Sequence, residues 1–93
     1  MVYDATYREF EAGKAGSGLP CARVASLLDD LGFDVKDCAA PGHKVFTHDH
    51  LEHFTSSGYN CKGGTGVVDR NYVGKIMRIL RTHEVDLRKH LGE

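Results

Sequence analysis

Four histidines stand close together in the middle of the chain, and the first of them has the setting of an acid–base catalyst. The four are His43, His48, His50 and His53. His43 follows Gly42, where the backbone can turn freely, and it opens an alternating segment, 43–48, that predicts a short strand. An imidazole titrates near about pH 6.5, so it can accept or donate a proton at neutral pH. His43 is therefore a candidate for proton transfer.

Cleavage of RNA is a reaction that such a histidine could carry out without a metal or other cofactor. The 2′-hydroxyl of RNA attacks the neighbouring phosphorus, so the protein has to move protons and stabilise charge on the phosphate. Histidine serves either proton transfer, typically for a gain of about 10²–10⁴ in rate. Cations and backbone N–H groups stabilise the phosphate. On this hypothesis His43 is the general acid or base, and the second proton-transfer group is open.

Strand geometry separates His43 from its neighbours. Successive side chains of a strand point to opposite faces, so Lys44 and His48 are predicted to lie opposite His43. We therefore interpret His48 as a structural residue or as the partner of a backbone group. Taken alone, His43 is more simply explained as a surface histidine without a function.

The same four histidines, together with Cys61, could instead bind zinc. The spacing is unfavourable, because neither His-x-x-x-His nor Cys-x-x-Cys occurs and a hairpin scatters ligands over both faces. We predict no metal site, and a small zinc-binding domain remains as an alternative. The chain has three cysteines, Cys21, Cys38 and Cys61. Their odd number and scattered spacing predict reduced thiols rather than disulfides.

Apolar spacing predicts the elements that position His43. Tyr3, Tyr7 and Phe10 indicate a short N-terminal helix that starts after Asp4, followed by a glycine-rich link over 13–18. A second helix has Pro20 in its first turn and ends at Gly32. Its apolar face consists of Cys21, Val24, Leu27, Leu28 and Leu31.

The second half of the chain predicts a small sheet and a long final helix. Strands are expected over 33–38, 43–48 and 54–61, then a loop over 63–66. The last helix is capped by Asp69 and is expected to kink or restart near Glu84. Its apolar side carries Tyr72, Val73, Ile76, Leu80, Leu87 and Leu91. The fold class is α+β, with both core helices packed on one face of a three-stranded antiparallel sheet.

Charge is distributed unevenly along the chain, although the net charge is only −1. Residues 1–34 carry three basic and six acidic side chains, whereas residues 61–83 carry five basic side chains and Asp69 alone. The five are Lys62, Arg70, Lys75, Arg78 and Arg81. A basic segment of this kind is typical of a surface that binds phosphates, and a solvated helix face is the alternative.

The order of these parts resembles the HicA toxins, small bacterial ribonucleases of toxin–antitoxin pairs. In that family a helix ending in Leu-Gly-Phe or Leu-Gly-Tyr leads to a histidine that opens a strand of the form His-x-[Ile/Val]-[Phe/Tyr]-x-His. Here Leu31-Gly32-Phe33 precedes the strand, and His43, Val45, Phe46 and His48 fall in its register. The departure is Pro41-Gly42, where the family usually has Gly-Ser or Gly-Thr.

This resemblance implies a double-stranded-RNA-binding-like fold over residues 19–91, with residues 1–18 as an N-terminal extension. It implies an endoribonuclease that cleaves mRNA with His43 as catalyst, without metal or cofactor, and that a HicB-like antitoxin neutralises. RNA contacts are expected from basic residues of the sheet and the last helix, namely Lys44, Lys62, Arg70, Lys75, Arg78 and Arg81. A non-catalytic module that binds double-stranded RNA is the second alternative.

At 93 residues the chain is expected to form one domain with a modest core. It has no apolar run that approaches the roughly 18 residues of a membrane helix. Its first residues, Met1-Val2-Tyr3-Asp4, lack the positive charge of a signal peptide. We therefore expect a soluble, cytoplasmic protein.

Overall fold

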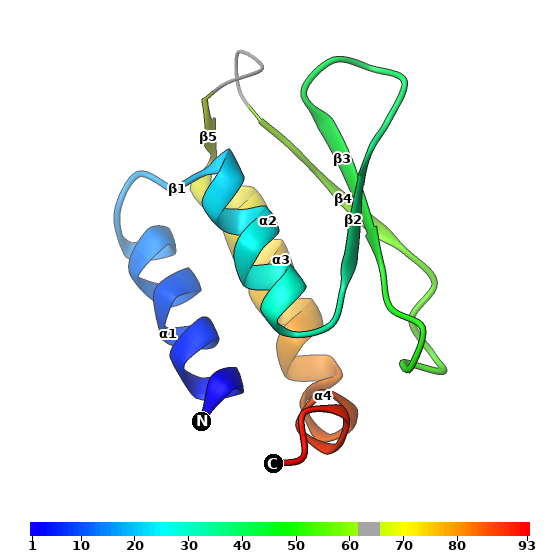
Figure 1. Ribbon diagram of the computed structural model, residues 1–93. Coiled ribbons are helices and arrows are strands. Elements are labelled where there is room, and N and C mark those ends of the chain that lie inside the picture. The colour runs from blue at the N-terminus through cyan, green and yellow to red at the C-terminus, as the bar shows by residue number, and fades with distance from the viewer. Residues whose placement is uncertain (62–65) are drawn as a thin grey trace.

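Residues 1–61 and 66–93, which the computed structural model describes, form an α+β domain (Figure 1). In chain order its elements are α1 (Val2–Ala15), β1 (Leu19–Pro20), α2 (Cys21–Asp30), β2 (Asp34–Asp37), β3 (His43–Thr47), β4 (Ser57–Asn60), β5 (Val67–Val68), α3 (Arg70–Thr82) and α4 (Glu84–His90). The predicted order of helix, three strands and helix is confirmed, and the N-terminal helix precedes it as expected.

The main sheet is an antiparallel meander in the order β2-β3-β4. Val35 of β2 pairs with Phe46 of β3, and His43 at the start of β3 pairs with Asn60 at the end of β4. β1 and β5 form a second, two-stranded antiparallel sheet. This small sheet was not predicted, because strands of two residues are too short to show an alternating pattern.

The helices lie on one side of the main sheet, and α1 packs mainly against α3 and to a smaller extent against α2 (Figure 1). Phe46 and Tyr59 point from the sheet into this layer and are fully buried. Since side chains alternate along a strand, His43 and Val45 lie on the opposite, uncovered face. Among the described residues, no helix covers the face of the sheet that carries His43 (Figure 1).

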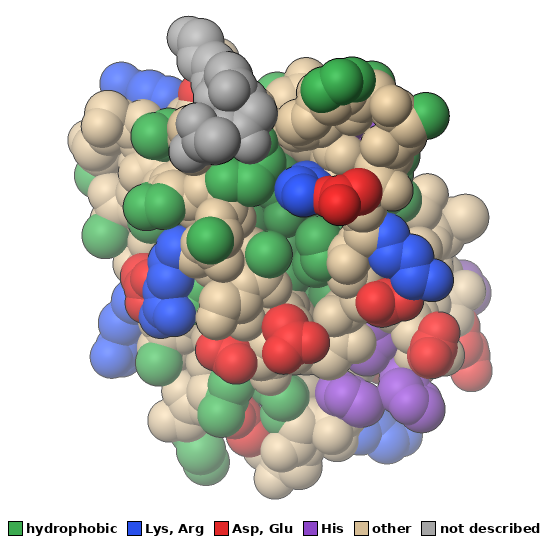
Figure 2. Space-filling view, turned by 45° about the horizontal axis from the view of Figure 1, so that its top comes forward, with side chains coloured by type: hydrophobic (Ala, Val, Ile, Leu, Met, Phe, Trp, Pro, Cys, Tyr) green, Lys and Arg blue, Asp and Glu red, His purple; other side chains and the backbone are tan. Residues whose placement is uncertain are grey.

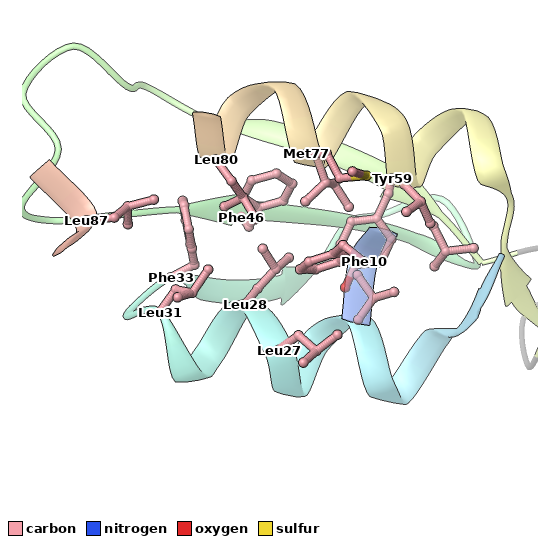
Figure 3. Packing of buried hydrophobic residues seen from close by; sticks show 14 of the residues in the cluster. Phe10, Leu27, Leu28, Leu31, Phe33, Phe46, Tyr59, Met77, Leu80 and Leu87 are labelled. Carbon is pink, nitrogen blue, oxygen red and sulfur yellow. The ribbon is translucent and has the colours of Figure 1, made fainter. Parts of the chain in front are cut away.

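Aromatic side chains fill the space between sheet and helices (Figure 3). Phe33 meets Phe46 edge-on, with ring centroids 5.4 Å apart, and Leu28 of α2 and Leu80 of α3 are buried with them. Burial of each such side chain contributes about 1.5–3 kcal/mol. In the described part of the chain, no helix has both the length and the apolar character needed to cross a membrane.

The N-terminal helix is longer than predicted. It begins at Val2 rather than after Asp4, because the carboxylate of Glu93 accepts a hydrogen bond of 2.8 Å from the Val2 N–H. Asp4 is inside the first turn and forms an ion pair of 2.6 Å with Arg88 of α4. Groups from the far end of the chain therefore stabilise the start of α1, which no local pattern could reveal.

The ends of the other helices follow the sequence closely. Gly32 adopts a φ of +92° just after α2, and Asp69 accepts hydrogen bonds from the backbone at the start of α3. The expected restart near Glu84 is the beginning of α4. Pro20 is an exception, since it lies in β1 immediately before α2. The outer strands are shorter than predicted by one to three residues at each end.

The expectation of reduced thiols is wrong for two of the three cysteines. Cys21, at the start of α2, and Cys61, directly after β4, form a disulfide with their Cα atoms 5.6 Å apart. Cys38 is a free thiol. The two bonded residues are 40 positions apart in sequence, and only the fold brings the start of α2 next to the end of β4. Spacing along the chain carried no sign of this pairing.

Candidate functional site

His43 is the first residue of β3 and is partly exposed. The turn before it closes with a hydrogen bond of 3.1 Å from the His43 N–H to the Ala40 carbonyl. Gly42 adopts a φ of +78°, a conformation that suits glycine. The Cys61 N–H donates to the Gly42 carbonyl at 2.7 Å, so the turn is also held by the residue after β4. The backbone therefore fixes where the His43 side chain starts.

The imidazole of His43 is oriented by an amide on the neighbouring strand. Its Nδ1 lies 2.5 Å from Oδ1 of Asn60, the residue that pairs with it in the ladder. An amide oxygen can only accept a hydrogen bond, so Nδ1 carries the proton. In the neutral ring the lone pair is then on Nε2. This nitrogen is the position from which His43 can accept a proton.

Asn60 is itself held in place by the first turn of α3. Its Nδ2 donates a hydrogen bond of 3.1 Å to the hydroxyl oxygen of Tyr72. His43, Asn60 and Tyr72 therefore form a chain of hydrogen bonds that runs from β3 through β4 to α3. We call these three residues the His43 chain.

Gly58 provides the surface on which the His43 ring lies. A Cβ atom at Gly58 would be 3.3 Å from both Cε1 and Nε2 of His43, and only 2.8 Å from the Lys44 carbonyl oxygen. Any larger residue would displace the ring or the strand. The sequence showed Gly58 as a weakness in a predicted strand, and its role here is the close approach that a strand glycine often marks.

Two of the predicted RNA-binding residues do not belong to α3, namely Lys44 and Lys62. Lys44 points to the face opposite His43 and forms an ion pair with Asp37 of β2. Its side chain is only 28% exposed. Lys62 lies outside the described residues.

The other four predicted RNA-binding residues are all exposed on α3, namely Arg70, Lys75, Arg78 and Arg81. Within the described residues none of them takes part in an ion pair. Arg81 donates to the Tyr7 hydroxyl of α1 at 2.7 Å, so it lies on the flank turned toward α1. Lys75 follows Tyr72 by about one turn and is its neighbour on the helix surface. The structure thus brings Lys75 nearer than Arg81 to the His43 chain.

His48 has a structural environment, as its place in the strand predicted. Its ring is 5% exposed and packs edge-on against Phe33. Nε2 lies 3.0 Å from the Leu31 carbonyl, and Nδ1 accepts a hydrogen bond of 3.1 Å from the His50 N–H. Burial lowers the pKa of His48, and charge on His90 and His50 lowers it further, against the opposing effects of Leu31 and Asp49. Both ring nitrogens are therefore occupied in the neutral form.

Two further histidines stack beside His48 at the surface. The rings of His50 and His90 lie 4.8 Å apart between centroids, and His90 is 4.9 Å from His48. Figure 2 shows histidine side chains side by side with acidic side chains around them. An open hollow of about 450 Å³ next to them is lined by His50, Glu52, Asp86, Lys89 and His90. We call His48, His50 and His90 the histidine cluster.

The histidine cluster is not the zinc site considered from the sequence. Among the described residues, no group of three or more His, Cys, Asp or Glu side chains is arranged to hold a metal ion. Cys61 is bonded to Cys21, so it offers no thiolate ligand. His43 belongs to a separate chain of hydrogen bonds, and His90 joins the cluster from a helix that the sequence placed far away.

Sequence reasoning found His43 but missed Asn60 and Tyr72. Asn60 was assigned to a strand and Tyr72 to the apolar side of the last helix, and each was correctly placed in its element. Their polar ends meet only because β4 pairs with β3 and α3 packs beside it. Comparisons with models of known protein families, with curated proteins and with solved structures give no match.

Proposed function

We propose that the chain is an endoribonuclease of the HicA type that cleaves mRNA without a metal or cofactor. The observation that carries this proposal is the setting of His43. Its imidazole lies on the face of the sheet opposite Phe46, donates through Nδ1 to Asn60, and has no hydrogen-bond partner at Nε2 among the described residues. A general base needs this combination of an open, oriented nitrogen and room for the substrate.

In the proposed reaction Nε2 of His43 accepts the proton of an RNA 2′-hydroxyl. The 2′-oxygen forms a bond to phosphorus while the bond from phosphorus to the 5′-oxygen breaks. The leaving 5′-oxygen takes a proton from an acid, and the products are a 2′,3′-cyclic phosphate and a 5′-hydroxyl end. Basic side chains stabilise the charge on the phosphate.

The fold and the charge of α3 support binding of an RNA backbone. A helix, a three-stranded antiparallel sheet and a helix is the order of the double-stranded-RNA-binding fold, which we include in the proposal. Exposed basic residues along α3 are suited to phosphates, and Lys75 is close enough to Tyr72 to extend such a surface toward His43. RNA would lie along α3 and reach across the edge of the sheet.

The test of catalysis compares the wild type with His43→Ala on labelled RNA in the presence of a chelator. We expect cleavage by the wild type, cyclic phosphate ends on the products, and a loss of about 10²–10⁴ in rate for the variant. His53→Ala, another exposed histidine with no described partner, is the matched control and should cleave normally. RNA retained without cleavage would favour the non-catalytic RNA-binding module instead.

The test of binding compares charge reversals on the two flanks of α3. Lys75→Glu should weaken RNA binding more than Arg81→Glu, because Arg81 is turned toward α1. Each lost phosphate contact should lower the slope of log affinity against log salt by about 0.7–0.9. Unchanged binding in both variants would mean that the basic face of α3 is only solvated.

A HicB-like antitoxin and a cytoplasmic location complete the proposal. To block RNA, the antitoxin must cover His43 or the basic face of α3, with an acidic or RNA-like surface, and its association should be sensitive to salt. Disulfides are rare in the cytoplasm, where thiols are kept reduced. The redox state of Cys21 and Cys61 in the cell is therefore a direct check on the location.

A further inference from the structure

We infer that Asn60 and Tyr72 are positioning residues that hold His43 in the form of a base with its free nitrogen on Nε2. This inference rests on the proposed function for its kinetic consequences, but the tautomer of His43 can be measured without any RNA. It assigns a role to two residues that neither the sequence pattern nor the family resemblance identified.

The hydrogen bond from the His43 ring to Asn60 determines which ring nitrogen carries the proton. A neutral imidazole has one donor and one acceptor nitrogen, and the hydrogen bond made by one nitrogen decides which role the other has. Oδ1 of Asn60 accepts from Nδ1. The ring therefore presents its acceptor nitrogen, Nε2, away from Asn60. Protonation of Nε2 leaves the bond to Asn60 intact, so the same partner suits the ring before and after it takes a proton.

The Asn60 amide can face the His43 ring in two orientations. A rotation of half a turn would exchange its oxygen and nitrogen, and the nitrogen would then donate to Nδ1 and select the opposite tautomer. Nδ2 of Asn60 instead donates to the Tyr72 hydroxyl at 3.1 Å. The half-buried Tyr72 ring is fixed by its place in the first turn of α3. The Tyr72 hydroxyl can accept or donate a hydrogen bond, so it holds the Asn60 amide in place, and the contact of Oδ1 with Nδ1 of His43 is what assigns the proton to Nδ1.

The surrounding backbone places the His43 ring. Gly58 leaves just enough room for Cε1 and Nε2 of His43 to lie against the strand. The disulfide at Cys61 and the bond from the Cys61 N–H to Gly42 fix the residue after Asn60. The His43 ring, the Asn60 amide and the Tyr72 hydroxyl thus belong to three elements, β3, β4 and α3, which their hydrogen bonds connect. Such support is what keeps a catalytic group within the geometry that it needs.

The direct test is nitrogen NMR of the neutral His43 ring in the wild type and three variants. The wild type should have the proton on Nδ1. Asn60→Ala should lose this preference, and Tyr72→Phe should weaken it because the amide is then free to turn. Asn71→Ala removes an exposed amide that has no described side-chain partner, and it should resemble the wild type. A wild-type ring with its proton on Nε2, or one that Asn60→Ala does not change, would overturn the inference.

The kinetic test compares Asn60→Ala with Asn60→Asp. Asn60→Ala should lower kcat by about 10²-fold with little change in KM, because the ring loses orientation rather than substrate contacts. Asn60→Asp keeps an acceptor for Nδ1 but adds a negative charge, so activity should be largely recovered and the acidic limb of the pH–rate profile should move to higher pH. A rate for Asn60→Ala equal to the wild type would contradict the positioning role.

The two proposals fail in different ways. If the Nδ1 proton and its dependence on Asn60 are observed but no RNA is cleaved, the positioning inference stands and the endoribonuclease proposal is wrong. If RNA is cleaved in a manner that depends on His43 but Asn60→Ala changes neither tautomer nor kcat, the endoribonuclease proposal stands and the positioning inference is wrong.

Discussion

The two ends of β3 present the same side chain in two opposite environments. His43 opens the strand on the uncovered face of the sheet, and one of its ring nitrogens is left without a described partner. His48 follows the strand on the covered side, and both of its ring nitrogens are hydrogen-bonded. The alternation of side chains in a strand puts the two rings on different faces. Position in the ladder, rather than residue type, decides which histidine can do chemistry.

Different contacts hold the chain in place around His43 and around His48. At the His43 end, the disulfide between Cys21 and Cys61 and the hydrogen bond from Cys61 to Gly42 hold the strands together. At the His48 end, a buried ring links Leu31 after α2 to the backbone of His50. The first connection includes a covalent bond to the buried Cys61, whereas the second is made by the hydrogen bonds of a buried ring. Substitutions at the two ends should therefore affect different properties.

The largest expected effect is a reciprocal one between the two histidines. His43→Ala should leave the free energy of unfolding nearly unchanged, since the side chain is partly exposed, while it abolishes cleavage. His48→Ala should lower that free energy by about 2–4 kcal/mol, because it leaves two backbone groups without partners and opens a cavity beside Phe33. It should retain cleavage at temperatures where it is folded. Urea titration and RNA cleavage on the same preparations check both halves.

A marked loss of stability in His43→Ala would contradict this contrast between the two histidines, because the His43 ring would then belong to the core. A loss of cleavage in folded His48→Ala would contradict it as well. In that case the histidine cluster would be part of the active site, although it faces away from His43.

Reduction of the disulfide should lower the free energy of unfolding at least as much as His48→Ala does, but without the contrast in cleavage. It links residues 40 apart in sequence, and closing a loop of that length restricts the unfolded chain by about 4 kcal/mol in the chain-entropy model. The variant with both Cys21→Ser and Cys61→Ser should therefore unfold at a much lower urea concentration than the wild type. Cys38→Ser, at the free thiol, is the control and should change little. Equal midpoints for oxidised and reduced wild type would contradict this.

Much of the fold was predictable because local patterns and tertiary packing agree. The apolar face of α2, the cap at Asp69 and the stop at Gly32 are local signals, and each is confirmed. The start of α1 and the β1–β5 pair depend on residues far away in sequence. For the same reason His90 could not be assigned to the histidine cluster. Its ring reaches His48 only after α4 has packed under the turn at Gly32.

The residues of the candidate site likewise include one that the sequence predicted and others that it did not. His43 was found because a histidine after a glycine at a strand start is a local pattern. Asn60 and Tyr72 could not be found, because their roles depend on the register of β4 and on the approach of α3. The disulfide is a similar case, since its two cysteines meet only across the fold. Residues that act through long-range polar contacts carry no periodic signal in one sequence.

A smaller effect should separate two glycines that share a backbone conformation. Gly32 and Gly92 have φ values of +92° and +76°. A Cβ at Gly32 would lie 2.6 Å from Nε2 of His90 and 2.9 Å from Nε2 of His48, whereas nothing lies within 4 Å of one at Gly92. Gly92→Ala should cost about 1 kcal/mol for its backbone alone. Gly32→Ala should cost about 1–3 kcal/mol more, because the histidine cluster must also move.

Thermal or urea unfolding of the two alanine variants measures this difference directly. Similar losses of unfolding free energy in the two variants would mean that the histidine cluster can move to make room for the added Cβ atom, and that His90 is not held tightly against the turn at Gly32. A selective loss in Gly32→Ala, with RNA cleavage retained, would show that the cluster supports the fold at one end of β3 while the His43 chain works at the other.

The smallest expected effect is a dependence of stability on pH that belongs to the histidine cluster. Burial and the neighbouring His90 and His50 lower the pKa of His48, so the unfolded chain binds a proton there at a higher pH than the folded chain does. Stability is then greatest above the ordinary histidine value of about 6.5 and falls as the pH is lowered through it. The other groups that line the hollow are Glu52, Asp86 and Lys89. Asp4, whose pKa is lowered mainly by its hydrogen bond to Arg88, should lose its contribution to stability only in the more acidic range near pH 4 and below.

Urea titrations between about pH 7.5 and 5.5 measure this dependence on pH. The free energy of unfolding should decline in the wild type and in His53→Gln, and should decline less in His48→Gln. An equal decline in all three proteins would mean that His48 takes up its proton as readily in the folded chain as in the unfolded one.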